Sequence, residues 1–287
     1  MSNRVTKSTT HARNFFPLAG VRQFLQQQIS LELQGLWSLV PISPPKTIFL
    51  LRQHLGYSSP FACQVVRSTK MVPAELAARV AAHLISKRRV RAKLNGWLEF
   101  DLLPSEFENW LARSQTAARS PLARAGVEVL PTGASVGLHQ YAHARCCNWL
   151  LLGRETGLLA TEAIAWERLL TDASTSQVEL LGVLLDLGDR ATEVAVDREV
   201  AVDGNDARAA DETDVRWALE PSTFGEAEAL RLAAAILAFQ QDYPLWGEHC
   251  RLDRSLAQAQ LGLIEIARSV LAWLLEVSLE LPAPQNL

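Results

Sequence analysis

The most evident chemistry in this chain lies in a run of seven residues that carries five positive charges. Ammonium and guanidinium groups at this density neutralise several phosphates and release their counterions, which makes binding strong and dependent on salt. The alternative is a solvated loop whose charges keep the protein in solution. The run therefore predicts a phosphate-binding surface or an ordinary charged one; its cations are Lys87, Arg88, Arg89, Arg91 and Lys93.

Two aromatic residues follow this run closely. Trp97 and Phe100 would lie on opposite faces of a strand, so one can join the core while the other stays exposed. An exposed aromatic ring beside cations can stack on an unpaired base. Packing in the core is the alternative, and it is the more frequent role of such rings.

A second group of candidates lies on one predicted helix. Tyr141 and Arg145 are four residues apart and share a face, either as a binding pair or as a packing tyrosine beside a surface arginine. His139, His143 and Cys146 also share a face. A zinc site would need a fourth ligand and a short ligand spacing, and neither is visible. We therefore predict no metal.

The string Gly133-Ala134-Ser135-Val136-Gly137 matches the pattern of a nucleophile elbow. That elbow requires a strand before it, a helix after it and a parallel sheet around it. The alternation of strands and helices that builds such a sheet is missing, so the glycines fit a linker better. The four cysteines form neither a disulfide framework nor paired CxxC motifs, and reduced thiols are expected. No catalytic residue and no cofactor is predicted.

Composition narrows the class of protein. With 287 residues and 48% apolar residues, the chain can build one large core or two ordinary ones. It has no uncharged apolar run long enough for a membrane span, so we expect a soluble, cytoplasmic protein. The net charge of −3 hides an excess of eight positive charges over residues 1–111 and of thirteen negative charges over residues 137–287. Such a division favours two modules with different partners, or halves that attract each other.

The elements that must position these residues fall into two groups. After a flexible lead (1–20), residues 21–111 predict a small α+β domain, in which Asn95-Gly96 joins two strands in a hairpin. Residues 112–136 predict a linker, and residues 137–287 predict an all-α bundle with an acidic loop near 200–215. Helices are predicted over 20–39, 61–67, 73–85, 138–152, 158–171, 177–188, 224–242 and 256–277, with one or two more turns over 104–111.

Two motifs resemble arginyl-tRNA synthetases. The stretch Gln140-Tyr141-Ala142-His143-Ala144-Arg145 is similar to the one that opens their C-terminal anticodon-binding helical domain. The stretch Asn95-Gly96-Trp97-Leu98-Glu99-Phe100 resembles a strand of their N-terminal additional domain. Only about 25 linker residues stand where the family has a catalytic domain of several hundred, so the resemblance implies a non-catalytic protein.

The resemblance implies that the basic run, Trp97 and Phe100 hold the tRNA elbow, while Tyr141 and Arg145 face the anticodon stem-loop. Glu99 stands where the family strand has an asparagine, and a carboxylate suits a phosphate neighbour poorly. We therefore expect a tRNA-binding protein that catalyses no reaction. The alternative is a protein–protein adaptor or assembly factor in which both RNA-binding folds serve as docking surfaces.

Overall fold

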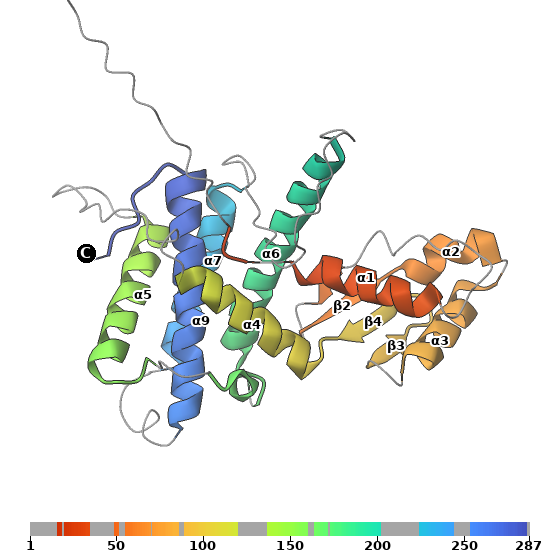
Figure 1. Cartoon of the computed structure of the whole chain (residues 1–287), viewed down its shortest axis with the longest axis horizontal. Helices are drawn as coiled ribbons and strands as arrows, with labels where there is room; N and C mark the ends of the chain where they lie inside the picture. The colour runs from red at the N-terminus through yellow and green to blue at the C-terminus, as the bar shows by residue number, and fades with distance from the viewer. Residues whose placement is uncertain are drawn as a thin grey trace, which may run out of the picture.

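A computed structural model shows a mainly helical chain with one small antiparallel sheet. The sheet lies towards one end of the long axis with α2 and α3, the helical bundle occupies the other end, and α6 lies between them, while α1 runs from near α6 towards α2 (Figure 1). The fold is thus α+β, as predicted. The structure describes residues 16–18, 20–34, 49–51, 55–69, 71–85, 89–119, 137–159, 164–171, 173–201, 224–243 and 253–285.

The described part of the sheet has four antiparallel strands in the order β1-β2-β4-β3. They are β1 (Phe49–Leu51), β2 (Gly56–Ser59), β3 (Val90–Ala92) and β4 (Leu98–Asp101). The predicted hairpin is confirmed: β3 pairs with β4, and Asn95-Gly96 lies in the turn between them. The other two strands were not predicted. Tyr57 of β2 lies opposite Phe100 of β4, and both rings are buried.

Helices α2 (Phe61–Thr69) and α3 (Pro73–Leu84) pack on each other, and α3 also packs on β3. Pro73 occupies the first turn of α3, where a missing N–H costs no hydrogen bond. Leu76, Val80 and Leu84 are fully buried, which confirms the apolar face that their spacing predicts.

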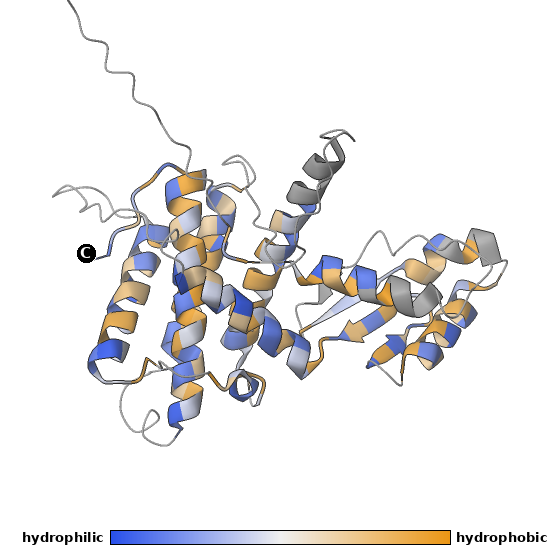
Figure 2. Cartoon of the chain, in the orientation of Figure 1, coloured by the Kyte–Doolittle hydropathy of each residue, from blue (hydrophilic) through white to orange (hydrophobic). Residues whose placement is uncertain are grey.

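The bundle is built around α9 (Arg254–Trp273), which contacts α4 (Pro104–Arg119), α5 (Leu138–Glu155) and α7 (Glu226–Asp242). The three- and four-residue spacing of Leu256, Ala259, Leu263 and Ile266 predicts a single apolar stripe on this helix. Neighbours cover it on all sides instead, so Leu261–Ala267 is buried without a break. Figure 2 shows apolar residues recurring along its whole length. The chain continues from α9 into a π-helical turn, Leu274–Ser278.

Helix α4 corrects the predicted boundary between domain and linker. Residues 112–119 belong to this helix rather than to a linker, and 120–136 lie outside the described residues. The side-chain amide of Gln115 donates to Glu265 of α9 at 3.0 Å, and Arg119 Nε donates to the same carboxylate at 2.8 Å. These contacts dock α4 on the bundle, although its sequence was predicted to close the first domain.

The end of the predicted flexible lead is also packed. Phe16 stacks on Phe224 with ring centroids 5.1 Å apart and meets the edge of Trp273 at 4.9 Å. Leu18 is buried as well. The prediction is therefore wrong for residues 16–18, whereas residues 1–15 lie outside the described part of the chain.

Helix α1 (Val21–Gln34) confirms the first predicted helix but turns a different face inward. Val21, Leu25 and Ile29 are buried, and α1 packs on α6 (Thr175–Ala201). Phe24, which the pattern of Phe24, Ile29, Leu33 and Leu36 predicts on the apolar face, is 40% exposed. Buried apolar residues from the sheet, α1 and the bundle form one continuous core.

Two further predictions concern the segments between the bundle helices. The helix predicted over 158–171 is wrong in its described part, where a four-residue 3₁₀ helix, Trp166–Leu169, replaces it. The predicted acidic loop lies outside the described residues from 202 onward. Across the described ranges, no helix combines the length and apolar character needed to cross a bilayer.

Candidate nucleic-acid interface

The first candidate surface, the basic hairpin, is partly neutralised by its own sheet. Arg91 lies opposite Glu99 in the register of β3 and β4, and its guanidinium reaches Asp101 at 2.7 Å and Glu99 at 3.6 Å. The Lys93 ammonium lies 3.0 Å from the Glu99 carboxylate. A phosphate would have to compete with these carboxylates for both cations. Arg89 is exposed, and Lys87 and Arg88 lie outside the described residues.

The aromatic residues of this hairpin do not form a stacking surface. Phe100 is 1% exposed and belongs to the core, so the expectation that it contacts RNA is wrong. Its position opposite Tyr57 in the central strand pair explains the burial. Trp97 is half-buried at the end of the turn. Of the two rings, only Trp97 therefore retains a surface that a ligand could reach.

The second candidate surface lies on α5. Tyr141 is 40% exposed, and the guanidinium of Arg145 lies over its ring, 5.8 Å from the centroid. Arg145 Nη1 donates to the Tyr141 hydroxyl at 3.3 Å, and Nε donates to the Gln240 side-chain oxygen at 3.1 Å. These contacts join a guanidinium and an aromatic ring on one side of the helix, as their spacing predicts. Within the described residues, Arg145 has no carboxylate partner.

The opposite face of α5 is structural. His139, His143 and Cys146 are all buried, and His143 Nδ1 lies 2.8 Å from the Pro284 carbonyl oxygen, to which its N–H donates. Burial lowers the pKa of His143 to about 4, so the ring is neutral at physiological pH. Among the described residues, no three His, Cys, Asp or Glu side chains lie close enough together to hold a metal ion.

More positive charge surrounds α5 than the sequence analysis singled out. Arg154 is exposed in the last turn of the helix, and Arg268 of α9 hydrogen-bonds to Cys147 on α5. Neither forms an ion pair with a carboxylate in the part of the chain that the structure describes. Arg268 was missed because it lies on another helix, more than 120 positions from Tyr141, and only the packing of α9 on α5 brings it near.

The outer side of α5 also exposes apolar side chains. Leu138 is 46% exposed, Leu151 52% and Leu152 38%. The helix begins after Gly137, whose backbone N–H donates to the Gln140 side chain at 3.2 Å. Gly137 therefore serves as the N-terminal cap of a helix, and the other four residues of the Gly-x-Ser-x-Gly string lie outside the described residues.

Comparisons with known proteins identify no relative of this chain. No family model, no curated protein and no solved structure was found to match the chain.

Proposed function

We propose that this chain binds RNA, with tRNA as the ligand that the sequence motifs favour, and that it catalyses no reaction. The observation that carries the proposal is the pair formed by Tyr141 and Arg145 on the outer side of α5. An exposed aromatic ring can stack on an unpaired base, while an adjacent guanidinium without a carboxylate partner can bind the phosphate beside that base. Arg154 and Arg268 add positive charge near the same helix.

The same contacts support α5, rather than the basic hairpin, as the main binding surface. In the hairpin, Arg91 and Lys93 already have Glu99 and Asp101 as partners, so an incoming phosphate displaces existing ion pairs. Arg145 is held instead by the neutral oxygen of Gln240. Because none of the described carboxylates pairs with Arg145, its positive charge favours an anionic ligand.

The proposal is tested with the full chain and purified total tRNA, in a gel-shift titration at about 50 mM and about 300 mM salt. Tyr141→Ala combined with Arg145→Gln is expected to weaken binding at least about tenfold, the loss of one stacking contact and one phosphate contact. The control is Arg79→Gln on α3, which removes an exposed guanidinium that pairs with Glu75 and lies far from α5. Equal affinities of the double variant and the control would contradict the proposal.

A second function, that of a protein–protein adaptor, is favoured by the leucines exposed on α5. Leu151 and Leu152 lie on the same helix as the proposed RNA contacts, and apolar side chains in such a position are typical of protein interfaces. Leu151→Glu distinguishes the two functions, because it adds a charge but removes neither Tyr141 nor Arg145. An adaptor would lose its protein partner in a pull-down with this variant. An RNA-binding protein would lose affinity for tRNA only modestly.

A further inference from the structure

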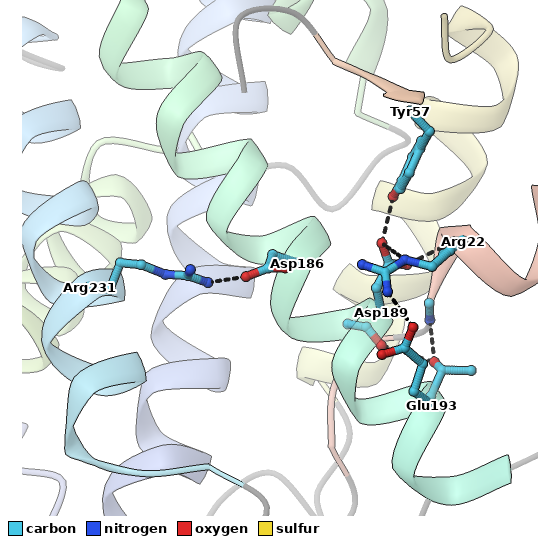
Figure 3. A network of polar contacts seen from close by, with 9 residues as sticks. Arg22, Tyr57, Asp186, Asp189, Glu193 and Arg231 are labelled. Carbon is cyan, nitrogen blue, oxygen red and sulfur yellow. Dashed lines mark hydrogen bonds and ion pairs between the residues drawn. The ribbon is translucent and has the colours of Figure 1, made fainter. Parts of the chain in front are cut away.

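A buried carboxylate lies where three segments distant in sequence meet. Asp189 of α6 is 1% exposed, and its Oδ1 accepts the backbone N–H of Arg22 at 2.8 Å. Its Oδ2 accepts the Tyr57 hydroxyl of β2 at 2.9 Å, and Arg22 Nε lies 3.6 Å away. Figure 3 shows Arg22 and Tyr57 converging on this one side chain. We call the contacts of Asp189 with α1 and β2 the Asp189 joint.

Two further contacts fasten α1 at the same place. The backbone N–H of Gly20 donates to the Thr192 hydroxyl at 2.7 Å, one turn along α6 from Asp189. A Cβ at Gly20 would lie 2.5 Å from that hydroxyl oxygen, so the close approach requires glycine. The Arg22 guanidinium also pairs with Glu193 at the exposed rim of the joint.

Asp186 and Arg190 of α6 face α7 rather than Asp189, whereas Glu193 lies on the side of Asp189 and pairs with Arg22. Asp186 pairs with Arg231 of α7, and Arg190 pairs with Glu228, also of α7, at 2.6 Å. Figure 3 shows Asp186 and Arg231 on the side of α6 opposite to Tyr57. Strand β1, which also packs on α6, contributes no titratable residue. Among the described residues, Asp189 therefore faces the Arg22 cation, which it shares with Glu193 at the rim, and the neutral hydroxyl of Tyr57.

We propose that Asp189 makes this joint sensitive to protons, so that α1 and the sheet are held more firmly on α6 when the carboxyl is protonated than when it is ionised. An ionised carboxylate loses its water when the joint closes, and Arg22 and Tyr57 replace that water incompletely. A neutral carboxyl carries a much smaller desolvation cost and can keep hydrogen bonds to the same groups. Opening the joint in acid therefore requires the release of a proton, and opening it at neutral pH does not.

The direction of the effect follows from proton linkage. Burial raises the pKa of Asp189 to about 6, against the opposing hydrogen bonds and the charge of Arg22. Because the closed joint then binds more protons than the open one, its stability falls as the pH rises from about 4 to 6 and is constant above that range. Between about pH 5 and about pH 7.5, the opening equilibrium is expected to rise about tenfold.

Amide hydrogen exchange of the full chain measures this opening directly. After correction for the intrinsic exchange rate, protection of peptides covering 20–34 and 56–59 is expected to be about tenfold lower at about pH 7.5 than at about pH 5. Peptides from the centre of α9 serve as the internal reference. Asp189→Asn should abolish the difference, whereas Asp186→Asn should retain it, since it removes the same charge from the face of α6 that contacts α7.

Tyr57→Phe gives a second test in case Asp189→Asn does not fold. It removes a hydrogen bond that lowers the pKa of Asp189, so the midpoint of the pH profile should move upward. Protection that is equal at both pH values in the unmodified chain would overturn the proposal. So would a pH dependence that persists in Asp189→Asn, or a midpoint that Tyr57→Phe leaves in place.

Discussion

Single residues in this fold owe their chemistry mainly to what surrounds them. His143 and Tyr141 belong to one short motif, yet His143 is buried against the Pro284 carbonyl while Tyr141 is 40% exposed beside Arg145. Their spacing places them on different sides of α5, and this division could be predicted from the sequence. The burial of Phe100 could not, because it depends on β2, a strand that was not predicted.

The environment of His143 predicts a loss of stability in acid. Its folded pKa of about 4 lies below the ordinary value, so between about pH 6.5 and 4 the unfolded chain binds the additional proton and stability falls. A shift of this size corresponds to about 3 kcal/mol, and Asp189 acts in the opposite direction over part of this range. The unfolding free energy of the unmodified chain, measured in urea relative to that of His143→Gln, should therefore fall by about 2 kcal/mol between about pH 6.5 and 4.5, because the Asp189 contribution is common to both.

The control for this prediction is His83→Gln, which changes a half-buried histidine of α3. It is expected to lack the pH-dependent difference from the unmodified chain that His143→Gln shows. A pH profile of His143→Gln that coincides with that of the unmodified chain would show that His143 is not the source of the loss.

At the scale of elements, the sequence predicts a helix or turn correctly where tertiary contacts only reinforce the local sequence pattern. The proline and leucine spacing of α3 and the Asn-Gly turn are such signals, and both predictions are confirmed. Helix α4 was underestimated because residues 113–116 are polar and read as a linker. Their helix packs on α9, where Gln115 and Arg119 hydrogen-bond to Glu265. Gln115 and Glu265 are 150 residues apart in the sequence. Tertiary contacts of this kind cannot be read from local propensity.

The hairpin offers a test of why its turn requires glycine. Gly96 has φ of 84°, and an added Cβ would lie 2.6 Å from the Pro73 Cβ, so Gly96→Ala combines backbone strain with a steric clash. We expect a loss of about 2 kcal/mol or more in unfolding free energy. Gly157→Ala is the matched control: its φ is 65°, but nothing lies within 4 Å of the new methyl group.

Strain alone should make the control cost about 1 kcal/mol. Urea titrations of both variants separate the two contributions. Equal losses would mean that Pro73 moves aside without cost and that the close packing of the turn on α3 contributes nothing.

At the scale of the whole molecule, the two predicted domains share one core. The charge division between the front and back of the sequence suggested independent modules, but charge pattern does not reveal where apolar surfaces meet. Phe16, Leu25 and Trp110 come from the front part of the sequence, yet they belong to the same buried cluster as Trp273. The proposed surface on α5 and the Asp189 joint are thus parts of one packed body.

This continuity predicts that Phe16 stabilises the bundle although it precedes the first helix. Phe16→Ala removes a ring packed between Phe224 and Trp273 and is expected to cost about 3 kcal/mol or more in unfolding free energy. Phe24→Ala, on the exposed side of α1, should cost less than about 1 kcal/mol. Urea unfolding followed by tryptophan fluorescence measures both. If Phe16→Ala were as mild as Phe24→Ala, the segment before α1 would be a free lead, and the bundle would not depend on the start of the chain.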